Sequence, residues 1–120
     1  MNKVIKMLIK EVIHNNIIVP IKMNTGDKYS VFDRNGNEIL SIIDGWATNH
    51  YSVSVNQKTI LAVKWNEGNE RPLTNDQKDM LDILNAVKEK IDLQETAQTM
   101  DKHELELATS LQQFLCNIKP

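Results

Sequence analysis

One hairpin signal in the middle of the chain limits its fold more than any other feature. The run Asp-Arg-Asn-Gly-Asn at residues 33–37 separates two apolar segments, 29–32 and 38–43. Asn35-Gly36 supplies residues that readily adopt the positive φ angles of a tight turn. The two apolar segments are therefore predicted to pair as antiparallel strands.

Neighbouring segments extend this hairpin into a meander. Residues 17–19 are β-branched and precede Pro20, which favours an edge strand because proline donates no hydrogen bond to a ladder. Farther along, apolar and polar residues alternate over 51–55 and 60–64, as in half-buried strands. The sequence thus predicts four to five antiparallel strands within residues 17–65, joined by short connections. The other predicted turns fall at 24–27, 44–45 and 56–58.

An amphipathic helix is predicted before the sheet, within residues 1–16. At about 100° per residue, its aliphatic side chains gather on one side and its lysines on the other. The aliphatic side is expected to cover the sheet. It consists of Val4, Ile5, Leu8, Ile9 and Val12, and the basic side consists of Lys3, Lys6 and Lys10.

Two helices are predicted after the sheet, behind a polar linker. Each begins with a capping-box pattern, in which a small polar side chain and an acid or amide three residues later bond to each other's backbone amides. Residues 93–100 fit either a connection between the two helices or a continuation of the first. The capping patterns are Thr74 with Gln77, and Asp101 with Glu104.

Apolar residues in both of these helices recur at steps of four, three and four. This spacing fits two antiparallel helices that pack on each other and on one face of the sheet. Because a coiled-coil seam has the same spacing, the alternative is a homodimer through the C-terminal helices. The residues are Met80, Leu84, Val87 and Ile91, then Leu107, Leu111, Phe114 and Ile118.

These elements together predict one α+β domain. It comprises an N-terminal helix, an antiparallel meander of four to five strands, and two C-terminal helices packed on one face of the sheet. A chain of 120 residues suits one domain, and 41% hydrophobic residues suffice for a core. The predicted zones are 1–16 for the first helix, 17–65 for the sheet, 66–73 for the linker and 74–120 for the helical hairpin.

Composition favours a reducing, aqueous compartment. Cys116 is the only cysteine, so no disulfide can form within the chain. No run of about 18 apolar residues is present, and charged residues interrupt the apolar N-terminus. We therefore expect a cytoplasmic protein with no membrane partner.

No signature of a metal, cofactor or catalytic site is found in the sequence. His14, His50 and His103 lie far apart, and none has a second ligand at helical or hairpin spacing. The four glycines are isolated turn residues, so no phosphate-binding loop is predicted. We accordingly expect binding rather than catalysis, with no cofactor and no metal.

The stretch after the turn at 44–45 is the best candidate for a partner-binding surface. Trp46, Asn49, His50 and Tyr51 all combine packing surface with hydrogen-bonding groups, and loops held by a rigid sheet often carry recognition. The alternative for Trp46 is a place in the core.

A basic ridge on the first helix is the second candidate surface. Lys3, Lys6 and Lys10 offer contacts to phosphates, and residues 1–34 carry a net charge of +3. However, the whole chain has a net charge of −2 and only two arginines, so nucleic acid is the less favoured partner. A solvated helix face is the simpler explanation of the ridge.

The leading functional hypothesis is a small protein-binding module. We expect an inhibitor, immunity protein or accessory factor, of a phage or mobile-element type among others, that acts by occluding a partner protein. The first alternative is a nucleic-acid-associated regulator that uses the basic N-terminal helix. The second is a small enzyme of unknown class, which would need a concave pocket with converging acid, base and polar groups.

Overall fold

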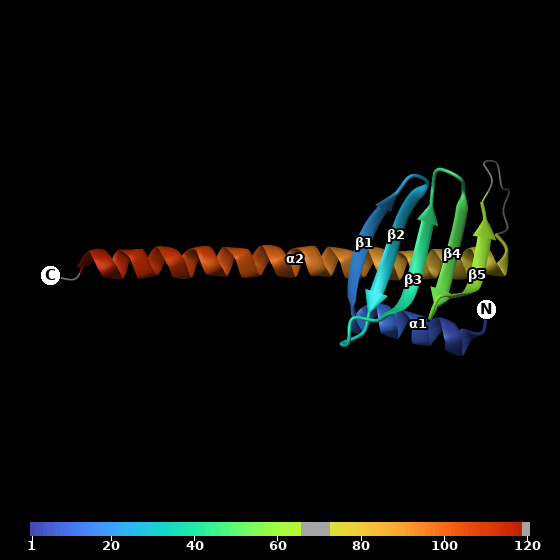
Figure 1. Cartoon of the computed structure of the whole chain (residues 1–120), viewed down its shortest axis with the longest axis horizontal. Coiled ribbons are helices and arrows are strands. Elements are labelled where there is room, and N and C mark those ends of the chain that lie inside the picture. Colours follow the sequence, from blue (N-terminus) through green and yellow to red (C-terminus); the bar gives the residue numbers. More distant parts are fainter. Residues whose placement is uncertain (66–72, 119–120) are drawn as a thin grey trace. The chain divides into compact units, whose positions relative to one another are not determined.

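The computed structural model describes residues 1–65 and 73–118, with the backbone alone for 98–118. It forms two compact units, Met1–Lys90 and Ile91–Pro120, and the first holds the sheet and all side chains discussed as sites below. The elements are α1 (Lys3–Asn15), β1 (Ile17–Met23), β2 (Gly26–Phe32), β3 (Glu38–Gly45), β4 (His50–Val55), β5 (Lys58–Lys64) and α2 (Asn75–Ile118) (Figure 1).

The predicted antiparallel meander is confirmed. Its five strands lie in the order β1-β2-β3-β4-β5, and each pairs with its neighbour in the chain (Figure 1). In the β2–β3 hairpin, the Asp33 carboxylate accepts hydrogen bonds from the amides of Asn35 and Asn37, both at 2.9 Å. Gly36 alone adopts a positive φ there, 82°, whereas the β4–β5 turn has two such residues, Asn56 and Gln57.

One face of the sheet forms the core. Because side chains alternate along each strand, the register places Val31, Leu40 and Val55 in one row and Tyr29, Ile42 and Val53 in the next. The N-terminal part of α2 covers this face. It contributes a buried stripe of Met80, Ile83, Leu84 and Val87. Burial of these aliphatic side chains, at about 25 cal/mol per Å² of apolar surface, stabilises the layer.

Helix α1 lies alongside the N-terminal part of α2 and runs parallel to it. Near its start, Lys6 Nζ lies 3.1 Å from Asp79 Oδ1 and 2.9 Å from Asp82 Oδ2. Near its end, Lys90 Nζ donates a 2.6 Å hydrogen bond to the His14 carbonyl. The N-terminal ammonium of the chain adds a 3.2 Å ion pair with Asp79.

The predicted apolar face of α1 is wrong. Of its five residues only Ile9 is buried, while Val4, Ile5 and Leu8 are 62%, 45% and 54% exposed. Ile13, absent from the predicted face, is 1% exposed. The helix instead buries the side that carries Ile9 and Ile13, and this orientation brings Lys6 to Asp79 and Asp82 of α2.

The helical C-terminal zone is confirmed in part. Thr74 and Gln77 form the predicted capping box, with bonds of 2.9 and 3.1 Å between side chains and amides. The structure then has one helix, α2, in place of two. Residues 93–100 hold no glycine or proline, so nothing local interrupts the helix, and Asp101 lies inside it. The side chains from Leu107 onward and the linker at 66–72 lie outside the described residues.

Among the residues that the structure describes, no helix has both the length and the apolar character needed to cross a lipid bilayer.

Candidate functional site

The four residues predicted to bind a partner do not form one surface. Trp46 lies in the β3–β4 turn and is 60% exposed. His50 and Tyr51 are consecutive in β4, so their side chains lie on opposite faces of the sheet. Asn49, with a φ of 57°, and Tyr51 both line a cleft on the core side of the sheet. The structure therefore joins Asn49 with Tyr51 and separates them from His50.

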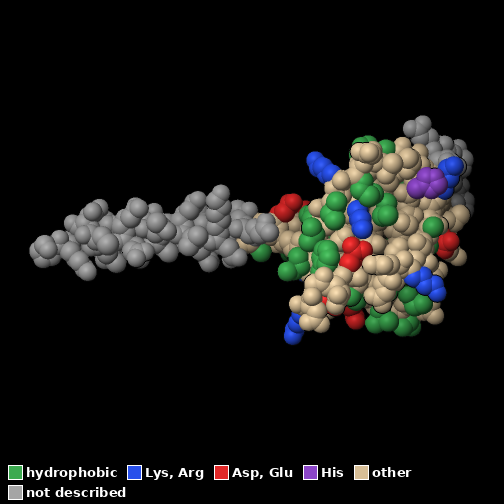
Figure 2. All heavy atoms as spheres, in the orientation of Figure 1, with side chains coloured by type: hydrophobic (Ala, Val, Ile, Leu, Met, Phe, Trp, Pro, Cys, Tyr) green, Lys and Arg blue, Asp and Glu red, His purple; other side chains and the backbone are tan. Residues whose placement is uncertain are grey.

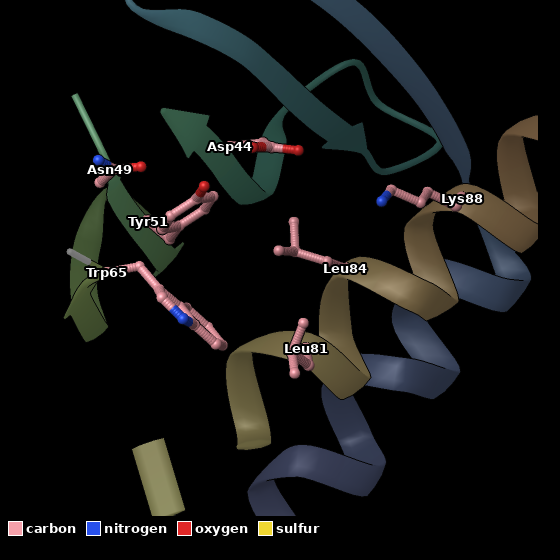
Figure 3. A pocket seen from close by; sticks show the side chains of 7 residues that line it. All are labelled: Asp44, Asn49, Tyr51, Trp65, Leu81, Leu84 and Lys88. Carbon is pink, nitrogen blue, oxygen red and sulfur yellow. The ribbon is translucent and has the colours of Figure 1, made fainter. Parts of the chain in front are cut away.

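This cleft has a volume of about 450 Å³ and lies between the sheet and α2 (Figure 3). Its lining combines one acid, one base, one amide, two aromatic rings and two leucines. Size and composition both fall within the range of small-molecule sites, which are mainly apolar with a few polar groups. The lining residues are Asp44, Lys88, Asn49, Tyr51, Trp65, Leu81 and Leu84.

Strand register positions the polar and aromatic groups of the cleft. Asp44 pairs with Tyr51 across β3 and β4, so the two side chains lie on the same face. The Trp65 amide donates a 2.7 Å hydrogen bond to the Asn49 carbonyl, which holds Trp65 beside the start of β4. The rings of Tyr51 and Trp65 meet edge to face, with centroids 6.0 Å apart.

Asp44 is the unusual group in the cleft. Partial burial raises the pKa of its carboxyl, Lys88 opposes that rise, and Asp27, its cross-strand neighbour on β2, adds to it. Burial, followed by the negative charge of Asp44, likewise raises the pKa of Tyr51. Within the described part of the chain, the Asp44 carboxylate has no hydrogen bond and no ion pair shorter than 4.0 Å. Half-buried carboxylates normally have such partners.

A second notable feature is an exposed apolar surface on α1. Its large side chains Val4, Ile5, Met7 and Leu8, here called the α1 stripe, are each between 45% and 62% exposed. Beyond the helix, Ile17, Val19 and Ile21 on β1 are also exposed and alternate toward the sheet face opposite the core. Figure 2 shows hydrophobic side chains gathered over the β1 side of the sheet and along the lower edge, where α1 lies.

Of the three predicted members of the basic ridge, only Lys6 takes part in an ion pair among the described residues. Lys6 is held between Asp79 and Asp82, and its hydrogen bonds to Asp82 and then Asp79 raise its pKa. Lys3 and Lys10 are exposed. Two exposed lysines beside a pair of acids provide a weaker phosphate-binding surface than the sequence pattern indicates.

Trp65, Asp44, Lys88 and the two leucines were not predicted as site residues. The sequence does contain a signal for Asp44. Leu40 and Ile42 are apolar residues of the predicted strand, and every second residue of a strand lies on the same face, so Asp44 is expected on the face that carries them. Lys88 and Leu81 offer no such signal, since their place in the cleft depends on how α2 packs on the sheet.

Among the described residues, no group of three or more histidine, cysteine or acidic side chains is placed to hold a metal ion.

No protein family model, no characterised protein and no solved structure matches the chain.

Proposed function

We propose that this protein is a protein-binding module that occludes a surface of its partner, with the α1 stripe as its main contact. The observation that carries the proposal is the rotation of α1, which leaves the apolar stripe of an amphipathic helix in solvent. Contiguous exposed apolar surface is uncommon on monomeric proteins and is typical of interaction sites.

The spacing of the stripe suits a helix that lies in a groove. Val4, Met7 and Leu8 stand at i, i+3 and i+4, the arrangement through which an amphipathic helix fills a partner's hydrophobic groove. Full burial of such a side chain contributes about 1.5–3 kcal/mol. Since each is about half exposed, burying the whole stripe would contribute several kcal/mol toward binding.

Charge beside the stripe indicates the chemistry of the partner's rim. Lys3 and Lys10 are exposed on one flank of α1, so an acidic border on the partner's groove would complement them. A second copy of the same chain fits less well. In a two-fold antiparallel pair of helices each flank meets itself, which would bring the lysines of both copies together.

Trp46 is a second proposed contact, since it is 60% exposed. Tyr51 is not included in this surface, because it packs on Trp65 in the cleft. Replacing Tyr51 would therefore disturb packing as well as any partner contact.

The test is an affinity capture from source-cell lysate with three forms of the full chain: wild type, Leu8→Gln and Leu93→Gln. Leu93 makes the last a matched control, because it is also an exposed helical leucine, at 58% against 54% for Leu8. We expect one stoichiometric, nuclease-resistant protein partner with wild type and Leu93→Gln, and at least a tenfold lower yield with Leu8→Gln.

Equal capture by all three forms would contradict the placement of the contact on α1. Loss of the captured material on nuclease treatment would instead support the nucleic-acid alternative. Size-exclusion chromatography of the purified wild type checks for a second copy, and a dimer that Leu8→Gln dissociates would replace the distinct partner.

A further inference from the structure

We propose that the cleft between β3, β4 and α2 binds a small zwitterion with a bulky apolar group, the chemical class of aromatic and branched aliphatic amino acids. This inference concerns residues outside the α1 stripe and goes beyond the proposed protein-binding function. Three features of the cleft support it, namely an acid and a base that have no hydrogen bond or ion pair among the described residues, and an apolar wall beside them (Figure 3).

Asp44 provides the site for a positive charge. Its carboxylate is half-buried, faces the cleft in Figure 3, and has no hydrogen bond or ion pair within the described part of the chain. Asp27 on the neighbouring strand adds a second negative charge close by. A ligand ammonium group beside Asp44 would donate the hydrogen bonds that the carboxylate lacks and neutralise part of this charge.

Lys88 provides the site for a negative charge. In Figure 3 its ammonium group points toward the Asp44 side of the cleft, yet the two are not within 4.0 Å of each other. No other described acid forms an ion pair with Lys88. A ligand that carries both charges would satisfy Asp44 and Lys88 together, whereas an amine or an acid alone would leave one of them unpaired.

The wall of the cleft specifies the rest of the ligand. Leu81 and Leu84 belong to α2 and lie across the cleft from Tyr51 and Trp65, which belong to the sheet side (Figure 3). Such a surface favours an aromatic or branched aliphatic group over a polar one. The volume of about 450 Å³ admits a single amino acid of that kind.

Trp65 can report occupancy through its fluorescence. The chain has two tryptophans, and Trp46 is exposed and does not line the cleft, so Trp46→Phe leaves Trp65 as the single emitter. In this background we would titrate three compounds that share a phenyl ring. L-phenylalanine carries both a positive and a negative charge, phenethylamine carries only the positive charge, and 3-phenylpropionate carries only the negative charge. L-leucine tests the aliphatic case.

We expect L-phenylalanine and L-leucine to change the Trp65 emission with saturation below about 10 mM, a modest affinity for a small ligand. Phenethylamine and 3-phenylpropionate should each bind about tenfold more weakly, because each leaves one charge unpaired. Asp44→Asn and Lys88→Met should each weaken L-phenylalanine binding by about tenfold as well. Lys78→Met, a matched change on the same helix outside the cleft, should have no effect.

Thermal melts of each variant verify that it is folded before titration. No saturable change with either amino acid in the folded Trp46→Phe protein would overturn the proposal. Equal affinity of the Trp46→Phe protein for all three ring compounds would overturn it too, since the two charges would then play no part. So would an unchanged affinity for L-phenylalanine when Asp44→Asn is added to that protein. The α1 stripe is unaltered in every variant, so these outcomes are independent of the capture experiment.

Discussion

Two partly buried aspartates are expected to have opposite effects on folding, because Asp79 has ionic partners and Asp44 has none among the described residues. Asp79 is 13% exposed and bonded to Lys6 and the N-terminal ammonium. Asp44 is half-buried and lacks such bonds within the described part of the chain. The effect of each ionised carboxylate on folding stability therefore depends on these contacts and not on its residue type.

For Asp44 we predict that Asp44→Asn raises the melting temperature at pH 7. Partial burial raises the pKa of this carboxyl above its ordinary value of 3.8, despite Lys88, so ionisation favours the unfolded chain. Wild-type stability should therefore recover as the pH falls through the raised pKa toward 3.8. Melts between pH 3 and 7 should show a gain for the variant that shrinks on acidification. A rise in melting temperature that does not depend on pH would mean that the new asparagine amide stabilises the fold, and not the loss of the carboxylate charge.

For Asp79 the sign is reversed. Partial burial alone would raise its pKa, but hydrogen bonds and charges from Lys6 and the N-terminus outweigh burial and lower it. Its contribution is thus present above the unfolded value of 3.8 and lost as the pH falls below it. We expect Asp79→Asn to destabilise by about 1 kcal/mol at pH 7. Asp76, 60% exposed, is the control, and Asp76→Asn should change little.

Glycine substitutions test the backbone next to the cleft. Gly26 has a φ of 153°, and a Cβ there would overlap the carbonyl oxygen of Asp44. Gly26→Ala should therefore destabilise by about 2–3 kcal/mol. Gly36 also has a positive φ but open space around it, so Gly36→Ala should cost about 1 kcal/mol. Chemical denaturation measures both, and equal losses would show that the contact with Asp44 is unimportant.

Among the elements, those with local determinants were predictable and those set by packing were not. The Asp33–Asn37 hairpin and the Thr74 cap follow from side chains that bond to nearby amides, so sequence alone predicts them. The rotation of α1 accompanies the burial of Ile9 and Ile13 and the contacts of Lys6 with Asp79 and Asp82, residues more than seventy positions away. Aliphatic periodicity identified the helix correctly but could not reveal which side would be buried.

The same distinction explains what the sequence predicted about the candidate sites. Asn49 and Tyr51 were singled out and do line the cleft, whereas Lys88, Leu81 and Trp65 join it only through packing between α2 and the sheet. The basic ridge was predicted from spacing on α1 alone, and Lys6 left it because acids on another helix hold it.

In the whole molecule, the unit that contains the sheet has two separate candidate binding features, the α1 stripe and the cleft. Its strands connect only to sequence neighbours, so a local meander and two helices suffice to build it. Within this unit the α1 stripe exposes apolar surface, and the cleft contains an acid and a base that form no ion pair with described residues. We propose the first of these, the α1 stripe, as a protein-binding surface.

Site-specific photo-crosslinking in source-cell lysate tests that role of the α1 stripe. A photoreactive phenylalanine analogue replaces Leu8 in one form of the chain and Leu93 in the other, two leucines of matched exposure. We predict a discrete protein adduct after irradiation from position 8 and none from position 93. No adduct from position 8, or the same adducts from both positions, would contradict a protein-binding role for the α1 stripe.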